Sequence, residues 1–227
     1  MTQTLGSTFP DQGVAEFRLD GYVALITGGG RGIGAGIAQA FALAGADVAL
    51  VARTTSELED VAAAIRAIGR SASITPADLT DVSHAARIVG RTIAEHGHLD
   101  ILVNNAGGAM PTPYLDTTPQ ALDDAFHFNV SAPFELTKQA TPHLMASGRG
   151  SVVNITSRMD SFTARQMVIY GTVKAALSHM TRLLAAELAP RFGSTGSPPG
   201  WSRPTTLSQC SPTRFANVSS RPPLSIG

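Results

Sequence analysis

Short apolar runs alternate along this chain with longer stretches of helical composition, and this alternation limits the folds it can adopt. The first run, Tyr22–Ile26, leads into the glycine-rich stretch Thr27–Gly34, and alanine-rich sequence follows to Ala44. Repeated strand and helix units of this kind build a parallel sheet with helices on its faces. The sequence therefore predicts an α/β fold, a doubly wound parallel sheet of the Rossmann type.

The same periodicity gives the boundaries of the expected elements. Ser56 is a candidate N-cap with Glu59 three positions later, Gly69 and Pro190 end helices, and Pro133 is a candidate kink. We expect strands at 22–26, 47–52, 71–75, 99–103 and 150–155, and helices at 34–44, 56–68, 82–96, 119–145 and 168–188.

The composition changes after Phe192. Of the 35 residues from Gly193 to Gly227, 22 are Ser, Thr, Pro or Gly, and none is acidic. Such a segment buries little apolar surface, and it shows no strand or helix period. We therefore expect a single Rossmann-like domain at 1–192 and an irregular, Ser/Pro-rich tail at 193–227.

Charge and cysteine usage exclude several classes of function. The formal net charge is +0, so no global positive field favours nucleic acid or an anionic membrane. Cys210 is the single cysteine, and the six histidines form no metal-binding motif, so we expect neither a disulfide framework nor a metal site. The chain has no signal-peptide pattern and no long apolar segment, so we expect a cytoplasmic protein whose partners are small molecules.

The glycine-rich stretch is a candidate phosphate cradle. Glycines between a strand and a helix let backbone N–H groups and the positive helix end face a pyrophosphate. The residues that we assign to the dinucleotide here are Gly28, Arg31, Gly32, Ile33 and Gly34. Because a glycine-rich turn also occurs without a ligand, its place at the first βα junction carries the assignment.

The end of the second strand bears on the choice of cofactor. An acid there binds the 2′-OH of NAD, whereas an arginine accommodates the 2′-phosphate of NADP. The strand ends in Val51-Ala52-Arg53, and the next acid is Glu57. Arg53, with Arg31, therefore favours NADP, and NAD remains possible; the alternative is that both arginines are solvated surface residues.

A tyrosine and a lysine four residues apart form the candidate acid/base pair. Tyr170 and Lys174 fall on one face of the predicted helix, with Ser157 thirteen positions upstream. A phenol ordinarily titrates near pH 10, and an adjacent ammonium favours its anion. This pair alone is common on helix surfaces, so its meaning depends on the other motifs.

Together these motifs resemble the short-chain dehydrogenase/reductase family, from about Leu19 to Phe192. The family's elements occur here in its order and approximate spacing: Thr27-Gly28-x-x-x-Gly32-x-Gly34, Asp78-Leu79, Asn104-Asn105-Ala106-Gly107, Asn129, Ser157 and Tyr170-x-x-x-Lys174. The resemblance implies hydride transfer between NADP(H) and a carbonyl or secondary alcohol substrate.

The resemblance also assigns roles to individual residues. Tyr170 is the implied acid/base, and Lys174 also binds the nicotinamide ribose. Ser157 would donate a hydrogen bond to the substrate oxygen, and Asn129 would hold a water that links Lys174 to solvent. Five further residues are implied to line the cofactor's path: Asp78, Leu79, Asn104, Ala106 and Gly107.

The resemblance ends where the tail begins. Family members continue with further strands, and Gly193–Gly200 lacks the run of β-branched residues that such a strand needs. An alternative function is therefore a catalytically impaired dinucleotide-binding protein, and another alternative is a chain that does not fold stably. The family also implies a homo-oligomer, formed through 119–145 and 168–188. Within the family, the sequence resembles hydroxysteroid dehydrogenases and 3-oxoacyl-carrier-protein reductases equally.

Overall fold

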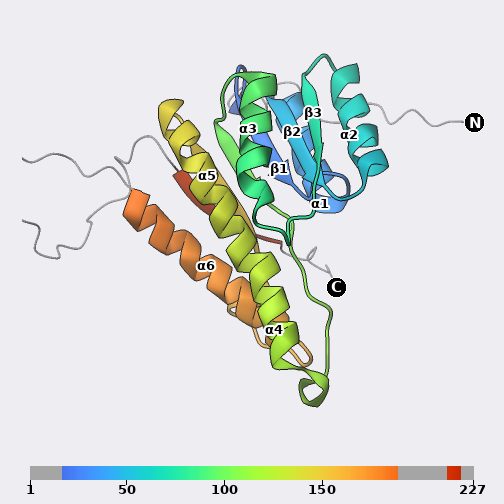
Figure 1. The fold of residues 1–227 in the computed structure, drawn as a ribbon, viewed down its shortest axis with the longest axis vertical. Coiled ribbons are helices and arrows are strands. Elements are labelled where there is room, and N and C mark those ends of the chain that lie inside the picture. The colour runs from blue at the N-terminus through green and yellow to red at the C-terminus, as the bar shows by residue number, and fades with distance from the viewer. Residues whose placement is uncertain (1–16, 189–213, 221–227) are drawn as a thin grey trace, which may run out of the picture.

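A parallel six-stranded sheet forms the centre of the molecule (Figure 1). The computed structural model describes residues 17–188 and 214–220, and the strand order is β3-β2-β1-β4-β5-β6. Every neighbouring pair in the sheet is parallel. The chain therefore has the doubly wound α/β architecture predicted from the alternation of its apolar runs.

The elements follow one another as alternating strands and helices. The strands are β1 (Val23–Thr27), β2 (Asp47–Ala52), β3 (Ala72–Pro76), β4 (Ile101–Asn104), β5 (Ser151–Ser157) and β6 (Arg214–Ser220). The helices are α1 (Gly32–Leu43), α2 (Thr55–Ala67), α3 (His84–His96), α4 (Pro119–Phe126), α5 (Ala132–Ala146) and α6 (Val168–Leu188). Short 3-10 turns lie at η2 (Tyr114–Asp116) and η4 (Arg158–Asp160), and a π turn, η3 (His127–Ser131), joins α4 to α5.

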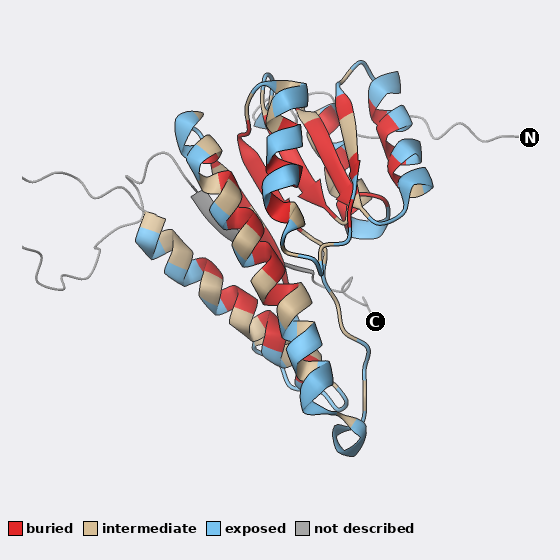
Figure 2. Cartoon of the chain, in the orientation of Figure 1, coloured by how far each residue is buried: buried red, intermediate tan, exposed pale blue. Residues whose placement is uncertain are grey.

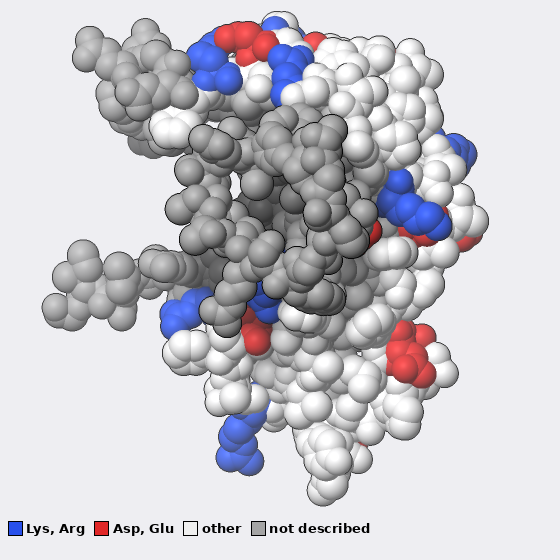
Figure 3. Space-filling model, turned by 90° about the vertical axis from the view of Figure 1, so that its left-hand side faces the viewer, with Lys and Arg blue, Asp and Glu red and all other residues white. Residues whose placement is uncertain are grey.

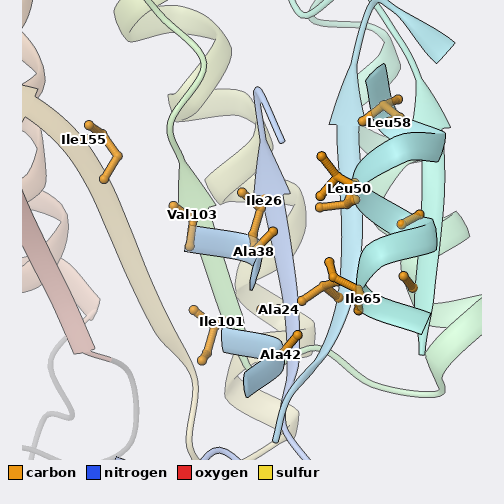
Figure 4. Packing of buried hydrophobic residues seen from close by; sticks show 14 residues of the cluster. Ala24, Ile26, Ala38, Ala42, Leu50, Leu58, Ile65, Ile101, Val103 and Ile155 are labelled. Atoms are coloured by element: carbon orange, nitrogen blue, oxygen red, sulfur yellow. The ribbon is translucent and has the colours of Figure 1, made fainter. Parts of the chain in front are cut away.

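Two apolar clusters hold the helices on opposite faces of the sheet. The residues of β1 alternate between them, because successive side chains of a strand point to opposite faces. Ala24 and Ile26 pack with α1 and α2 (Figure 4), whereas Leu25 packs with α3 and α5. Figure 2 shows the same arrangement, with buried residues on the strands and on the sheet-facing sides of the helices.

The second helix begins one residue earlier than the sequence predicts. Its N-cap is Thr54, not Ser56, and the Thr54 side chain makes no capping hydrogen bond. The capping-box interpretation of Ser56 and Glu59 is therefore wrong. The end of the helix agrees with the prediction, because Gly69 has the positive φ of 81° that follows a helix C-terminus.

The long helix predicted at 119–145 is interrupted by the π turn η3. Pro133 lies at the start of α5 and has no N–H, so it cannot donate the α-helical hydrogen bond to the carbonyl of Asn129. A π turn widens the helix at this point and reorients the side chains within it. The π turn thus lies just before the proline, and it contains Asn129, four residues before Pro133.

The strand β6 corrects the prediction for part of the tail. Residues 214–220 were expected to be irregular, but they pair in parallel with all of β5, from Ser151 opposite Arg214 to Ser157 opposite Ser220. The edge of β5 offers a row of N–H and C=O groups, and such an edge recruits a strand of weak intrinsic preference. The predictions for 193–213 and 221–227 lie outside the described residues.

A buried carboxylate ties three strands together at the amino edge of the sheet. Asp100 has a fully buried side chain and accepts hydrogen bonds from the backbone N–H of Val23 at 2.9 Å and from Arg149 Nε at 2.9 Å. Arg149 also stacks over the Tyr22 ring, 4.0 Å from its centroid. This cluster fixes the edge opposite to the glycine loop.

Charged side chains form small separate groups on the face drawn in Figure 3. Basic and acidic residues lie there among uncharged ones, and the described part of this face carries no continuous basic surface. Among the described residues, no helix is long and apolar enough to span a membrane, and no group of three potential metal ligands comes together.

Candidate active site

A cavity with a volume of about 870 Å³ lies among the described residues at the carboxyl ends of the strands. In doubly wound folds ligands bind at this edge, outside the ends of the strands. The glycine loop after β1, the ends of β2 and β5, and the loops after β3 and β4 all contribute to its wall, as does α6. The predicted site residues that line it are Gly28, Arg31, Gly32, Ile33, Arg53, Asp78, Leu79, Ala106, Gly107, Tyr170 and Lys174.

The glycine loop packs too closely for side chains at two of its positions. Gly28 has a φ of 64°, and a Cβ there would lie 2.8 Å from the amide nitrogen of Asn105. A Cβ on Gly34 would overlap the carbonyl oxygen of Gly28, so this glycine supports the loop from behind and does not line the cavity. The first turn of α1, which begins at Gly32, has no side-chain cap, so its N–H groups remain available to an anion.

Two arginines flank the cavity at the end of β2. Arg31 and Arg53 are both exposed, and neither forms an ion pair with an acid among the described residues. Glu57 lines the same wall; a Cβ on Gly30 would lie 3.3 Å from its Oε2. In the sequence Glu57 is the first acid after β2, and the first turn of α2 places it at this wall.

The loop after β3 supplies Asp78 and Leu79. The Asp78 carboxylate accepts hydrogen bonds at 2.9 Å from both the N–H and the hydroxyl of Thr80. These bonds, the backbone one first, hold the pKa of Asp78 below its usual value. Asp78 therefore presents a fixed anionic acceptor at the cavity wall.

The segment after β4 differs from the prediction at one residue. Asn104 does not line the cavity; its Nδ2 donates to Thr137 Oγ1 at 3.1 Å and to Asn154 Oδ1 at 2.8 Å in the core. Asn105 lines the cavity instead, and its amide donates to the carbonyl of Thr27 at 2.9 Å. Because strand side chains alternate between faces, the first asparagine of the pair turns away from the opening.

Tyr170 and Lys174 lie side by side in the cavity wall. Tyr170 is half-buried and Lys174 is buried, and Lys174 Nζ lies 5.8 Å from the centre of the Tyr170 ring. The ammonium donates to the carbonyl of Ile155 on β5 at 3.0 Å. Burial lowers the pKa of Lys174 from 10.5 to about 8, so the side chain is charged at neutral pH and can exchange a proton just above it.

Asn129 and Ser157 lie beside the cavity rather than in its lining. Asn129 Oδ1 accepts from the N–H of Gly108 at 2.8 Å, and its Nδ2 donates to the carbonyls of Gly108 and Ala125. A Cβ on Gly107 would lie 2.7 Å from Asn129 Oδ1 and 3.1 Å from Lys174 Nζ, so both groups pack against this glycine. The π turn thus fastens the loop after β4 next to Lys174.

Ser157 ends β5 and caps the following turn. Its Oγ accepts a hydrogen bond from the backbone N–H of Met159 at 3.2 Å. No described residue takes the hydrogen of its hydroxyl in a hydrogen bond, so the group can still donate one. The two preceding residues, Ile155 and Thr156, line the cavity.

The chain is similar to many proteins of one family. The family model described as short chain dehydrogenase matches residues 22–192, which agrees with the range predicted from the motifs. An uncharacterised oxidoreductase of Mycobacterium tuberculosis is 51% identical over 185 residues, or 81% of this chain and 70% of that protein.

Solved structures give the same result. A 7α-hydroxysteroid dehydrogenase, in complex with NADH and 7-oxo glycochenodeoxycholic acid, is 34% identical with a TM-score of 0.74, over 79% of this chain and 69% of that one. A short chain dehydrogenase from Burkholderia cenocepacia, in complex with NADP, is 38% identical with a TM-score of 0.71, over 75% of this chain and 70% of that one.

Proposed function

The chain belongs to the short chain dehydrogenase family, and we propose that it transfers a hydride between NADP(H) and a carbonyl or secondary alcohol, with Tyr170 as general acid and base. The observation that carries this proposal is the position of Tyr170 and Lys174 together in the wall of a cavity that begins at the glycine loop. A proton donor (Tyr170), a cation (Lys174) and an anion-binding loop then line the same cavity.

Tyr170 gives its proton to the substrate oxygen in the reducing direction. This leaves a phenolate, and the nearby Lys174 ammonium stabilises that charge. The carbonyl of Ile155 holds the ammonium in place at 3.0 Å. Because the pKa of Lys174 is lowered to about 8, the lysine can itself return a proton to the phenolate between turnovers.

Ser157 and Asn129 complete the proposed catalytic group. The Ser157 hydroxyl, fixed by the N–H of Met159, donates to the substrate oxygen and stabilises charge there. The Asn129 side chain is occupied by Gly108 and Ala125, so we assign the relay water to its main-chain carbonyl, which Pro133 cannot bond.

The residues of the glycine loop fit a dinucleotide. The close packing at Gly28 and Gly34 leaves the backbone N–H groups uncovered, and Arg31 and Arg53, which pair with no acid among the described residues, offer cations for a 2′-phosphate. Asp78, Leu79, Asn105, Ala106 and Gly107 would hold the adenosine side. When bound, the cofactor supplies the hydride acceptor or donor. The NADP and NADH complexes of similar proteins support NADP with NAD as an alternative.

Two substrate classes are candidates for the proposed reaction, steroid alcohols and 3-oxoacyl thioesters. The similarity to a hydroxysteroid dehydrogenase supports the first. A panel of steroid, acyl-thioester and sugar carbonyls, assayed by NADPH and NADH absorbance, tests the proposed reaction. Turnover of at least one member supports it, and no turnover by a folded protein that binds NADPH contradicts it.

A second candidate is a dinucleotide-binding protein without turnover. The family match ends at Phe192, and the similar structures extend beyond the part that this chain covers. Catalysis that needs a segment after that point would then be lost while the glycine loop remains. NADPH binding without activity on any member of the panel is the result expected for this candidate.

We also propose that the protein forms a homo-oligomer through α4, α5 and α6. These helices expose large apolar side chains, among them Phe134 at 44%, Met145 at 55% and Leu183 at 57%. Light scattering in solution should give a multiple of the 23.6 kDa chain mass. A monomer at all concentrations would contradict this assignment.

A further inference from the structure

The turn after Ser157 is attached to the helix that carries Tyr170 by a side-chain pair. Ser178 Oγ on α6 donates a hydrogen bond of 2.5 Å to Asp160 Oδ2, at the end of η4. Asp160 lies three residues after Ser157, and Ser178 lies one helical turn after Lys174. Residues four apart share a helix face, so Tyr170, Lys174 and Ser178 all look toward the same side of α6.

Met159 makes a second contact between this turn and the helix. Its N–H donates to Ser157 Oγ, and its carbonyl oxygen would lie 3.0 Å from a Cβ placed on Gly171. The helix can approach the turn this closely because residue 171, directly after Tyr170, has no side chain. Met159 is therefore held between the proposed hydrogen-bond donor and the proposed acid.

The carboxylate of Asp160 has a second hydroxyl partner that does not reach α6. Ser161 Oγ donates to Asp160 Oδ1 at 3.0 Å. A carboxylate that accepts from two hydroxyls makes stronger hydrogen bonds than a neutral acceptor would. Of these two bonds, the one to Ser178 reaches α6 and the one to Ser161 stays within the turn, so the two can be tested separately.

We propose that Asp160 and Ser178 are positioning residues that set the place of the Ser157 hydroxyl relative to Tyr170. The inference rests on the proposed function, in which both groups meet one substrate oxygen. Without the pair, the η4 turn loses its side-chain hydrogen bond to α6 and keeps the contact at Gly171. Ser157 then loses its fixed alignment, whereas the glycine loop and the cofactor side of the cavity stay as they are.

The test compares Ser178→Ala and Asp160→Ala with the matched control Ser161→Ala. Removing the link should lower kcat by roughly tenfold to a hundredfold, since small misplacements of reacting groups have effects of this size. The NADPH Kd should stay within about twofold of the unchanged protein. Asp160→Asn keeps an oxygen acceptor for Ser178 and should restore most of the activity, and Ser161→Ala should be close to the unchanged protein.

Two results would overturn the inference. One is a kcat of Ser178→Ala equal to that of Ser161→Ala. The other is a parallel loss of kcat, NADPH affinity and melting temperature in both link variants, which would indicate a purely structural role.

Hydrogen exchange separates this inference from the proposed reaction. If the unchanged protein binds NADPH but turns over no substrate, the proposed function fails, and exchange of the amides of 158–161 still reports on the link. Faster exchange in Ser178→Ala than in Ser161→Ala supports the link, and equal exchange refutes it.

Discussion

Replacing Lys174 by methionine should raise the stability of the protein at neutral pH and remove its activity. The lysine is 4% exposed, and burial lowers its pKa from 10.5 to about 8. A lysine pKa that is lower in the folded state means that folding opposes the charged form. The cost is fully present below pH 8, and it disappears as the pH rises from 8 toward 10.5.

The size of the effect follows from two opposing contributions. The difference between 10.5 and about 8 corresponds to about 3 kcal/mol of cost at pH 7. Methionine avoids this cost but leaves the carbonyl of Ile155 without the Lys174 hydrogen bond, a loss of about 1–2 kcal/mol. We therefore expect Lys174→Met to be more stable than the unchanged protein by about 1–2 kcal/mol at pH 7.

Urea unfolding between pH 7 and pH 10 measures this prediction. The unchanged protein should gain stability relative to Lys174→Met as the pH rises, and the two curves should cross at about pH 9 to 10. Lys138→Met is the matched control, because Lys138 is 65% exposed and should give no such pH dependence. A Lys174→Met protein that is less stable at pH 7, or a constant difference across the range, would refute the reasoning.

Two further predictions concern the cofactor end of the cavity and the opposite edge of the sheet. Arg53→Ala should raise the NADPH Kd roughly tenfold and leave the NADH Kd nearly unchanged, because only NADPH carries the 2′-phosphate. Glu57→Gln should lower the NADPH Kd, because it removes a negative charge near that phosphate. Fluorescence titration with both cofactors measures each effect. Asp100→Asn should destabilise the fold by about 3 kcal/mol in urea, because it leaves Arg149 without its buried carboxylate; a change below about 0.5 kcal/mol would contradict the role of this cluster at the amino edge.

Much of the fold was predictable from the sequence, because the central strands are marked by local composition. The apolar runs at β1, β2 and β4 are buried on both faces, and such strands read as continuous hydrophobic segments. Gly69 likewise marked the end of α2 through its backbone conformation. These features depend on a few neighbouring residues, so periodicity and punctuation are sufficient to find them.

The structure differs from the sequence predictions where contacts between distant parts of the chain determine the local conformation. The strand β6 depends on the open edge of β5, a partner that is distant in the sequence. The inward turn of Asn104 depends on the strand register, which places it against Thr137 and Asn154. The alternation of strand side chains could have indicated that only one residue of the Asn104-Asn105 pair faces the cavity.

The links within the candidate site could not be found from sequence. The contact of Asp160 with Ser178, and that of Glu57 with the glycine loop, join residues 18 or more positions apart with no motif between them. Tyr170 and Lys174 were found because their spacing of four residues is itself a structural signal on a helix. The four-residue spacing thus predicts that Tyr170 and Lys174 lie together on one helix. The contacts that connect this helix to other elements are visible only in the structure.

Substitution of Tyr170 by phenylalanine tests the central claim most directly. The change removes one hydroxyl and keeps the ring that packs beside Lys174. Turnover of an active substrate should fall by at least about a hundredfold, while the NADPH Kd stays within about twofold of the unchanged protein. A Tyr170→Phe protein that retains most of its turnover, or loses NADPH binding as severely as activity, would contradict the assignment of Tyr170 as the acid and base.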